Sequence, residues 1–459
     1  MKNWSGKKIV IIGLAREGKA LAQFAAREGA RVVVSDLRSE EILASSLQEL
    51  DGLKIDTVLG EHPMTLLDKT DVLAMSPGVP ADIPLAQAAR ERNILITNEP
   101  QEFLRRVPTA VIGITGSAGK TTTTSLTGHM GKVAGHKSWV GGNIGRPLIG
   151  DLPQIRSHDF VVQELSSFQL ELWTRSPQIA AILNITPNHL DRHRTMTSYI
   201  NAKANILRYQ SANDIAVLSA DDDGCKAVRS MVRGRLRLFS ATQEVEDGAF
   251  VRDGQIWLRG KHGSETAVCS LSDIQLRGSH NVLNVLAAVV LADSAGITIP
   301  QMVEAIGTFY GVEHRLETVR TLNGVQYVND SIATAPERAL AAIRAFDEPI
   351  ILLAGGRDKD MKWSTWAHEV PRRTKQVVLF GKLGEMLEKL LNMTGQQSEI
   401  AKTMSCLKRV ETLDEAVNVA SKTAVSGDIV LLSPGGTSFD AYTDFAERGE
   451  HFRELVRSL

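Results

Sequence analysis

The sequence contains few cysteines, almost no net charge and no long apolar segment. Its three cysteines among 459 residues lie far apart, which excludes a disulfide framework and a zinc knuckle (Cys225, Cys269 and Cys406). Lysine and arginine number 52 against 53 aspartate and glutamate, and this net charge of −1 offers no overall positive field to nucleic acid or to an anionic membrane. No apolar run approaches the roughly 18 residues of a membrane span.

The beginning of the chain and its length add two further constraints. The amino-terminal segment MKNWSGKKIVIIGL reaches Gly13 too early to contain the apolar core of a signal peptide. At about 100–200 residues per domain, a chain of 459 residues predicts about three domains. We expect a cytoplasmic protein with small-molecule partners, without nucleic acid or a membrane span, and we expect it to be a monomer.

Short apolar runs that alternate with helical stretches predict three consecutive α/β domains. The first domain, 1–107, is expected to be Rossmann-like, with a helix at Lys19–Glu28 and parallel strands at Lys8–Ile12, Arg31–Ser35, Val72–Met75 and Ile94–Thr97. The third domain, 313–459, has the same pattern, with strands expected at Val325–Asn329, Ile350–Ala354, Gln376–Phe380 and Asp428–Ser433.

The central domain, 108–312, begins at a polar, proline-containing break, RRVPT (105–109). Its expected strands are Ala110–Ile114, Phe160–Gln163, Ile179–Asn184 and Ile215–Ser219, and a helix is expected at Asn281–Ala295. Between about 230 and 275, Gly and Asp turns separate short alternating segments such as VRDGQIWLRG. This pattern predicts a small antiparallel insertion.

A glycine-rich turn, Gly116-Ser-Ala-Gly119-Lys120-Thr121, lies between an apolar strand and a helical run. In such a turn the backbone N–H groups and the helix amino terminus can hold phosphates, with the lysine on the β- and γ-phosphates and the threonine hydroxyl on Mg²⁺. The strict P-loop pattern would place glycine where Ile114 stands. An ordinary strand–helix turn is the alternative, but the GK-T context favours a nucleotide site.

A second glycine-rich turn, Gly13-Leu-Ala15-Arg16-Glu17-Gly18, is a weaker signal. Ala15 replaces the middle glycine of GxGxxG, and Asp36 stands where a ribose-binding carboxylate is expected. The turn alone is compatible with a dinucleotide, with the phosphates of another nucleotide, or with helix-on-strand packing.

Acidic and histidine side chains follow two expected strands of the central domain. Glu164 closes the strand DFVVQE, and His189 and Asp191 follow the next strand in ITPNHLDRH. The carboxyl ends of parallel strands are where open α/β sheets bind ligands, and oxygen ligands suit Mg²⁺. Helix capping by Glu164 and a satisfied loop histidine are the alternatives, but this position beside the phosphate loop favours a metal site.

Seven segments in this order resemble the Mur ligase family of ATP-dependent, amide-forming enzymes. They are GITGSAGKTT, GGNIG (141–145), ELSSFQLE (164–171), NITPNHLDRH (184–193), GSHNVLN (278–284), EHRLE (313–317) and NDSIAT (329–334). The resemblance covers essentially the whole chain. ELSSFQLE and LLSPGGTSFDAYTDFAERG (431–449) are most similar to members that add glutamate to a UDP-linked muramoyl-alanine.

The resemblance implies an ATP site and two Mg²⁺ ions. The ATP-binding residues would be Thr115, Gly116, Ser117, Gly119, Lys120, Thr121, Thr122, Asn281, Asn284, Arg315 and Asp330. The metal ligands would be Thr121, Glu164, His189 and Lys203, the last as a carbamate, and Lys120, His189 and Lys203 would be catalytic. Without the family, Lys203 would be interpreted as a solvated helix lysine.

The same resemblance gives the first domain a uridine-diphosphate site and the third domain an amino-acid site. The implied substrate-binding residues are Gly13, Asp36, Arg38, Ser76 and Asn143 for the nucleotide substrate, and Thr334, Lys359, Ser438 and Phe445 for glutamate. Three positions depart from the family pattern: Ile332 replaces a common lysine, Ala118 a common asparagine, and Leu37 a polar residue.

The implied reaction joins D-glutamate to the alanine carboxylate of UDP-N-acetylmuramoyl-L-alanine through an acyl phosphate, in peptidoglycan synthesis for cell-wall growth, cell shape and cell division. Ligation of L-glutamate, a folylpolyglutamate-type ligase, a nicotinamide-dependent oxidoreductase and a non-catalytic nucleotide switch are the alternatives. The oxidoreductase alternative leaves the Gly116–Thr121 turn and the acidic residues unexplained.

Overall fold

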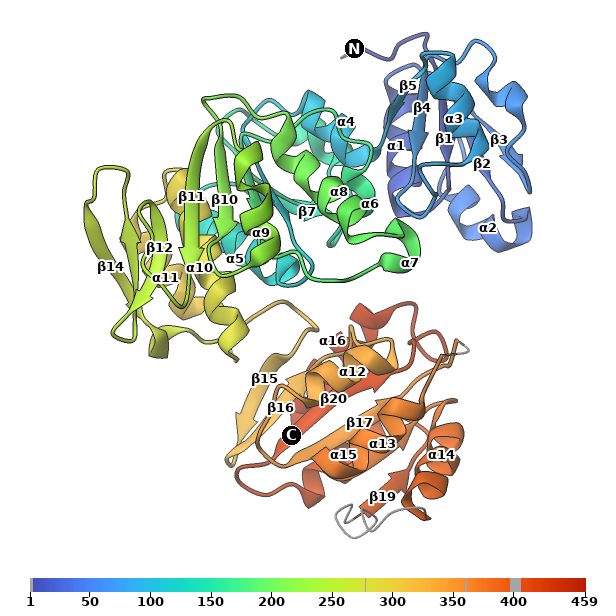
Figure 1. Ribbon diagram of the computed structural model, residues 1–459. Helices are drawn as coiled ribbons and strands as arrows, with labels where there is room; N and C mark the ends of the chain where they lie inside the picture. Colours follow the sequence, from blue (N-terminus) through green and yellow to red (C-terminus); the bar gives the residue numbers. More distant parts are fainter. Residues whose placement is uncertain (1–2, 277, 360, 397–405) are drawn as a thin grey trace. The chain divides into compact units, whose positions relative to one another are not determined.

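The computed structural model describes residues 3–276, 278–359, 361–396 and 406–459 (Figure 1). It forms two compact units. Unit 1 comprises Met1–Gln275 and Ser279–Phe309, and unit 2 comprises Leu276–Gly278 and Tyr310–Leu459. Within the described residues, no helix is both long and apolar enough to cross a membrane.

The first sheet of unit 1 is parallel throughout, in the order β3-β2-β1-β4-β5. Its strands are β1 (Lys8–Ile12), β2 (Arg31–Asp36), β3 (Ile55–Leu59), β4 (Val72–Met75) and β5 (Leu95–Thr97). They are connected by α1 (Arg16–Arg27), α2 (Glu40–Gln48), η1 (Met64–Leu67) and α3 (Pro84–Glu91). The apolar runs of β1, β2 and β4 are almost fully buried, as the sequence predicted.

The second sheet of unit 1 has nine strands in the order β14-β13-β12-β11-β10-β9-β6-β8-β7. These are β6 (Val111–Thr115), β7 (Ser138–Gly142), β8 (Phe160–Glu164), β9 (Ile179–Ile182), β10 (Ile215–Ser219), β11 (Arg235–Ser240), β12 (Gly248–Arg252), β13 (Gln255–Arg259) and β14 (Glu265–Ser270). β6 pairs in parallel with β8 on one side and with β9 on the other. The turns that follow these three strands therefore lie together at the carboxyl end of the sheet.

The prediction of a small antiparallel insertion at 230–275 is only partly right. β12, β13 and β14 are antiparallel, and the hairpin turn is at Asp253-Gly254 as expected. However, β11 pairs in parallel with β10, and β12 pairs in parallel with β11. The segment therefore extends the central sheet instead of forming a separate layer, and Phe250 packs with Val245 and with Ala220, which follows β10, in a small cluster of its own.

Helices complete the nine-stranded part of unit 1, the nine-stranded domain. They are α4 (Glu99–Arg106), α5 (Lys120–Val133), η2 (Ile149–Gln154), α6 (Ser167–Leu170), α7 (Leu190–His193), α8 (Met196–Arg208), α9 (Asp223–Val228), η3 (Arg229–Met231), η4 (Leu271–Asp273), α10 (Ser279–Ser294) and α11 (Ile299–Thr308). The nearly continuous apolar run in α10 packs against α5, which follows the phosphate loop.

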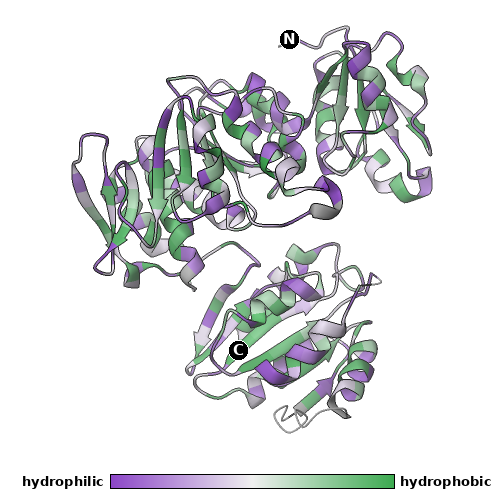
Figure 2. Ribbon diagram, in the orientation of Figure 1, coloured by the Kyte–Doolittle hydropathy of each residue, from purple (hydrophilic) through white to green (hydrophobic). Residues whose placement is uncertain are grey.

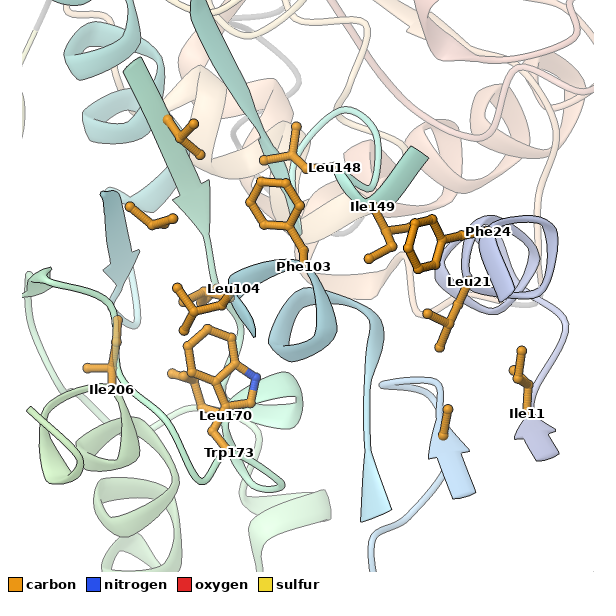
Figure 3. Packing of buried hydrophobic residues seen from close by; sticks show 14 of the residues in the cluster. Ile11, Leu21, Phe24, Phe103, Leu104, Leu148, Ile149, Leu170, Trp173 and Ile206 are labelled. Carbon is orange, nitrogen blue, oxygen red and sulfur yellow. The ribbon is translucent and has the colours of Figure 1, made fainter. Parts of the chain in front are cut away.

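One hydrophobic cluster connects the two sheets of unit 1. Leu21 and Phe24 on α1 belong to the same buried cluster as Ile149 on η2 and Phe103 on α4 (Figure 3). In Figure 3 the ring of Phe24 lies beside Ile149, and Trp173 lies below Leu104. α4 therefore joins the two sheets through buried apolar contacts as well as through the chain itself.

Unit 2 contains a six-stranded sheet in the order β15-β16-β20-β17-β18-β19. β15 is antiparallel and the other pairings are parallel. The strands are β15 (Glu317–Leu322), β16 (Val325–Asn329), β17 (Ile350–Gly355), β18 (Thr374–Phe380), β19 (Cys406–Arg409) and β20 (Ile429–Gly435), and the helices are α12 (Pro336–Ile343), α13 (Ser364–Arg373), α14 (Gly384–Gln396), α15 (Leu413–Thr423) and α16 (Phe445–Ser458).

Helices cover both faces of the unit 2 sheet because the side chains of its central strands alternate between two cores. Leu352 packs with residues of α12, α13 and α14, whereas its neighbour Leu353 packs with residues of α15 and α16. The central strands β17 and β20 are accordingly green along their length in Figure 2, as expected of strands buried on both faces.

Candidate active site

The turn between β6 and α5 has the backbone of a phosphate loop. Gly119 caps α5 with a φ of 81°, a left-handed conformation that favours glycine. A Cβ at Gly119 would overlap with Oδ1 of Asn284, so the loop is packed tightly against α10. Asn184 fixes the other side, because its Oδ1 accepts a 2.8 Å hydrogen bond from the N–H of Ala118.

The charged and hydroxyl groups predicted to bind phosphate all lie on this turn. Nζ of Lys120 donates to the carbonyl oxygens of Gly116, at 2.9 Å, and Ser117, at 3.3 Å. Thr115 is fully buried at the end of β6, while Thr121 and Thr122 are half-buried in the first turn of α5. The helix dipole of α5 adds a positive potential at the same place.

Glu164 lies at the end of β8, directly beside β6. Its Oε1 accepts a 2.7 Å hydrogen bond from Nδ2 of Asn143, and its carbonyl oxygen accepts one of 2.9 Å from the N–H of Asn143. Its Oε2 is buried without a hydrogen-bond partner in the described part of the chain. This oxygen is therefore available to ligate a cation, since leaving a buried carboxylate oxygen unpaired is costly.

Lys203 is buried, contrary to the expectation of a solvated helix lysine. It is 1% exposed on α8, and its Nζ donates to the carbonyl oxygen of Gly116 at 2.8 Å and to Oγ1 of Thr115 at 3.3 Å. Burial, and next the positive charge of Lys120, hold the pKa of Lys203 well below its usual range. Burial at the phosphate loop therefore disfavours the charged form of this amine.

His189 is held at the start of α7 in a left-handed conformation with φ of 54°. Its carbonyl oxygen accepts hydrogen bonds from the N–H groups of Arg192 and His193. The ring of Phe168 contacts the imidazole of His189 edge-on, with centroids 5.0 Å apart, and stacks on His193 at 5.3 Å.

The two asparagines predicted to face the nucleotide lie beside the phosphate loop. Nδ2 of Asn284 donates to Oδ1 of Asn281 at 2.8 Å, and Oδ1 of Asn284 accepts from Oγ1 of Thr123 at 3.4 Å. Helix α10 thus brings both amides to the beginning of α5. Among the described residues, no three His, Cys, Asp or Glu side chains form a metal cluster by themselves.

A cavity of about 640 Å³ lies in the first domain, over the carboxyl ends of β1, β2 and β4. All four residues predicted from the sequence for this domain line it: Gly13, Asp36, Arg38 and Ser76. Further lining residues include Arg16, His62, Gly78 and Val79. The carboxyl ends of parallel strands are the usual ligand-binding edge of such a sheet.

Asp36 anchors the glycine turn of this cavity. Its Oδ2 accepts a 2.7 Å hydrogen bond from the N–H of Leu14, and both carboxylate oxygens bind the guanidinium of Arg38. Burial opposes ionisation, but the hydrogen bonds from Arg38 and Leu14 outweigh it and lower the pKa of Asp36 to about 2. Asp36 therefore carries a full negative charge and holds Arg38 at the cavity edge.

Close packing explains two glycines of the same turn. Gly13 has a φ of 90°, and its carbonyl oxygen accepts a 2.7 Å hydrogen bond from Oγ of Ser76. A Cβ at Gly18 would overlap with that carbonyl oxygen of Gly13. Ala15, which replaces the middle glycine of the motif, is the residue that caps α1. The turn is thus built for tight backbone packing at the cavity.

In unit 2, Asp330 lies at the end of β16, the strand beside β20. Its carboxylate accepts hydrogen bonds from Oγ of Ser433, at 2.9 Å, and from the N–H of Leu316. Burial raises the pKa of Asp330 to about 7, and the charges of Arg315 and Arg338 counteract this only in part. Arg315, predicted to contact the nucleotide, is therefore close to Asp330 within the same unit.

Of the residues predicted to bind glutamate, Thr334, Lys359 and Ser438 lie in loops of unit 2, and Phe445 is the first residue of α16. Nζ of Lys359 lies 5.0 Å from the ring centroid of Phe439, next to the buried Ser438. The carbonyl oxygen of Phe445 accepts a 2.7 Å hydrogen bond from Oγ of Ser331. Thr334 follows Ser331 in the loop between β16 and α12.

The sequence motifs did not predict the structural roles of several residues. Arg16 and Arg192 make hydrogen bonds between the first domain and the nine-stranded domain, and Asn184 holds the phosphate loop. Gln169 donates to the buried carboxylate of Glu17 at 2.6 Å. Glycine spacing pointed to the turn of Arg16, and the motif NHLDRH contains Arg192, but neither pattern indicates a contact between domains.

Comparison with protein families gives three matches in chain order. Residues 7–98 match the Mur ligase MurD-like N-terminal domain, and residues 114–292 match the Mur ligase middle domain. Residues 314–436 match the Mur ligase glutamate ligase domain.

Solved structures of low sequence identity show the same fold. UDP-N-acetylmuramate-alanine ligase MurC from Thermotoga maritima is 21% identical with a TM-score of 0.56, and the match covers 98% of this chain and 99% of that chain. A UDP-N-acetylmuramoyl-L-alanyl-D-glutamate–2,6-diaminopimelate ligase is 17% identical with a TM-score of 0.57, over 99% and 92% of the two chains.

Curated relatives are similar over their full length. UDP-N-acetylmuramoylalanine–D-glutamate ligase from Symbiobacterium thermophilum is 42% identical over 456 residues, which cover 99% of this chain and 98% of the relative. The protein of the same name from Clostridium botulinum (strain 657 / Type Ba4) is 39% identical over 457 residues, or 99% and 97% of the two chains. Identity of this extent shows that the chain is a three-domain α/β ligase and belongs to the Mur ligase family.

Proposed function

We propose that this ligase joins D-glutamate to the alanine carboxylate of UDP-N-acetylmuramoyl-L-alanine, a cytoplasmic step of peptidoglycan precursor synthesis. The observation that carries the proposal is the full-length similarity to relatives that bear this activity in their names. Two features of the structure support it: the first-domain cavity, and the burial of Glu164, at the end of the strand beside β6, and of Lys203, against the phosphate loop. We further propose that the enzyme acts as a monomer.

Each domain has one binding task in this proposal. Domain 1–107 binds the uridine nucleotide, with Asp36 and Arg38 at the base and Gly13 and Ser76 at the diphosphate. Domain 108–312 binds ATP and the metal ions, and domain 313–459 binds glutamate. The glutamate-binding residues are Thr334, Lys359, Ser438 and Phe445, and Arg315 and Asp330 contact the nucleotide.

The donor set fits Mg²⁺. Mur ligases depend on ATP, and a hydroxyl, a carboxylate oxygen and phosphate oxygens are the ligands that Mg²⁺ prefers. The buried Oε2 of Glu164, which has no partner among the described residues, is a ready ligand together with Thr121. We assign a second ion to His189 and a carbamate on Lys203. The ions would neutralise charge on the transferring phosphoryl group.

The environment of Lys203 supports the carbamate. A neutral amine adds to the carbon of CO₂, forms an N–C bond and releases one proton, which leaves a carboxylate-like group on the side chain. The buried, low-pKa amine of Lys203 is ready for this reaction, and Thr115 and the carbonyl oxygen of Gly116 lie within hydrogen-bond distance of its nitrogen. The modification converts a cation into a metal ligand.

Ligation then proceeds in two steps. The alanine carboxylate attacks the γ-phosphorus of ATP, which gives an acyl phosphate and ADP. This activation is needed because a free carboxylate is a poor electrophile. The amine of glutamate attacks the activated carbonyl, and phosphate leaves as the amide bond forms. Lys120 and the N–H groups of the loop stabilise the developing negative charge. Asn143 orients Glu164, and Asn281 and Asn284 hold the nucleotide.

The experiment that tests the proposal is an assay of phosphate release with ATP, UDP-N-acetylmuramoyl-L-alanine and either D- or L-glutamate. We expect phosphate release only when all three substrates are present, and with D-glutamate in preference to L-glutamate. A preference for L-glutamate would leave the ligase class intact and change the amino acid. ATP hydrolysis without an acceptor and without glutamate would contradict the ligase mechanism, and activity with a folate acceptor instead would contradict the assigned substrate.

A further inference from the structure

Arg16 extends from the first domain to the nine-stranded domain. It stands in the first turn of α1 and lines the first-domain cavity. Its guanidinium donates to the carbonyl oxygens of Gly145, at 2.6 Å, Asn143, at 3.0 Å, and Gly142, at 3.5 Å. One planar cation thus binds three carbonyl groups of a single loop, a geometry that the fork of arginine suits.

The loop that Arg16 binds also holds Glu164. Asn143 donates to Oε1 of Glu164 from its side chain and to the carbonyl oxygen of Glu164 from its backbone. Gly142 has a φ of 100°, and a Cβ there would overlap with the carbonyl oxygen of Glu164. The carboxylate of Glu164 is therefore bonded to the same loop that Arg16 binds.

Arg192 makes the reverse connection, from the nine-stranded domain to the first domain. Its guanidinium donates to the carbonyl oxygens of Gly78, at 3.2 Å, and Val79, at 2.7 Å, and both residues line the cavity. The same guanidinium lies 4.8 Å from the ring centroid of Phe168, whose edge contacts His189. Arg192 therefore joins the cavity rim to the His189 loop.

The contact between Gln169 and Glu17 keeps the first of these connections in place. Glu17 follows Arg16 on α1, is 6% exposed, and accepts a 2.6 Å hydrogen bond from Nε2 of Gln169 on α6. The start of α1, where Arg16 stands, is therefore held against the nine-stranded domain by a second contact.

We propose that Arg16 and Arg192 are positioning residues that couple the contents of the first-domain cavity to the Asn143–Glu164 pair and to His189. The cavity ligand would be a nucleoside diphosphate that carries the acceptor, as in the proposed function, on which this inference rests. A ligand that contacts Arg16, Gly78 and Val79 restricts both arginines and so orders the phosphate-transfer residues. Because coupling between sites is reciprocal, magnesium and nucleotide bound at the phosphate loop increase affinity for the acceptor in return.

The test measures this coupling directly. Calorimetry gives the affinity of the enzyme for Mg²⁺·ADP with and without saturating UDP-N-acetylmuramoyl-L-alanine, for the wild type and for Arg16→Ala and Arg192→Ala. Arg194→Ala is the matched control. Arg194 also connects the two domains, through a 3.0 Å ion pair with Asp82, but Asp82 does not line the cavity and the arginine side chain is 78% exposed.

We expect the acceptor to tighten Mg²⁺·ADP binding by about 5- to 150-fold in the wild type and in Arg194→Ala, the usual range of coupling between sites. In Arg16→Ala and in Arg192→Ala the coupling factor falls to about twofold or less, while the affinity for Mg²⁺·ADP in the absence of the acceptor stays close to that of the wild type. Arg16→Lys and Arg192→Lys keep the positive charge, and their coupling factors should lie between those of the wild type and the alanine variants. This graded response distinguishes a loss of coupling from a loss of folding.

Three results would overturn the inference: no coupling in the wild type, an equal loss of coupling in Arg194→Ala, or a loss of acceptor affinity alone with coupling unchanged. The last result would make the arginines simple ligand contacts. If UDP-N-acetylmuramoyl-L-alanine fails to bind the wild type at all, the proposed function fails, and the inference with it.

Discussion

The side-chain nitrogen of Lys203 lies 2.8 Å from the carbonyl oxygen of Gly116, so a residue of α8 reaches beneath the phosphate loop. The lysine is 1% exposed, and its pKa is held well below the usual range by burial. An ammonium group would be costly here, whereas a carbamate would place a negative charge next to the metal ligands.

The first prediction concerns this lysine. Lys203→Ala is expected to lower kcat on the order of 10²- to 10³-fold, as loss of one preorganised electrostatic group does. Formate or acetate in the assay should restore part of the rate, because a small carboxylate can fill the space of the missing carbamate. Phosphate release measures both effects, and a carbamate signal in ¹³C NMR with labelled bicarbonate reports the modification itself.

Lys226→Ala is the control for this experiment, because Lys226 is a surface lysine of α9 paired with Asp223. It should keep full activity and show no response to formate. Full activity of Lys203→Ala would contradict the assigned role of the lysine.

The second prediction concerns Asp36. Asp36→Asn removes the charge that binds Arg38 and weakens the acceptor for the N–H of Leu14, so both the cation and the glycine turn lose their anchor. Loss of one charge-assisted hydrogen bond costs about 1.5–3 kcal/mol, so the Kd for UDP should rise on the order of 10- to 100-fold. Titration calorimetry with UDP measures it, and Asp56→Asn, at an exposed position on β3, serves as the control.

The pKa of Asp36 also determines how the charge of this residue responds to pH. Its folded pKa is lowered to about 2, so its contribution to stability is present above the unfolded pKa and is lost only as the pH falls towards 2. The ratio of UDP affinities between wild type and Asp36→Asn should therefore stay constant across the neutral range. A ratio that changes there would show that another group titrates at the cavity.

The third prediction concerns the buried carboxyl groups Glu17 and Glu99. Burial raises the pKa of Glu17 to about 7, and burial together with the charge of Glu17 raises the pKa of Glu99 to about 8. Between the unfolded and the folded pKa values, these two carboxyl groups thus keep their protons in the folded protein but have lost them in the unfolded chain. Stability should therefore fall as the pH rises from the unfolded pKa of these carboxyl groups towards the raised folded values.

Thermal unfolding at several pH values tests the pair. The wild-type Tm should decrease from about pH 5 to about pH 8, whereas Glu99→Gln should show a flatter profile and the higher Tm at the alkaline end. Glu28→Gln, at the exposed end of α1, should follow the wild type. Parallel profiles for wild type and Glu99→Gln would contradict the raised pKa values.

The fourth prediction concerns Gly18. A Cβ at this position would overlap with the backbone carbonyl oxygen of Gly13, where no flexible side chain can move away. Gly18→Ala should therefore destabilise the first domain by about 1–3 kcal/mol and abolish UDP binding. Gly307→Ala in α11 has open space around the new methyl group and should stabilise by about 0.5–1 kcal/mol. Denaturant unfolding and UDP binding compare the two variants.

The strands that the sequence did not predict lie at sheet edges. Apolar runs revealed the buried strands, such as β1 and β17, but β3, β7, β15 and β19 each form the edge of a sheet. An edge strand needs only one buried face, and β3 reads IDTVL with its Asp and Thr exposed. Such a pattern has no continuous apolar run to detect.

The residues of the candidate site also differ in whether the sequence could predict their position. Motif spacing was enough to predict that Gly116–Thr121, Glu164 and the 184–193 segment lie together at the carboxyl end of the sheet, because β6, β8 and β9 are neighbours. Lys203 and Glu17 were not recognisable as buried, since charged residues on helices normally face water. Their burial depends on which elements pack against α8 and α1, and this is a property of the tertiary structure.

The shared cluster of unit 1 bears on the order in which the chain becomes structured during synthesis. Phe24 of α1 packs beside Ile149 of η2, although the two residues are separated by more than a hundred positions (Figure 3). The first sheet is complete at β5, yet one face of α1 still lacks its apolar cover when β5 leaves the ribosome. A nascent chain that stalls before η2 would expose this face, and chaperone binding is expected to be strongest in that interval.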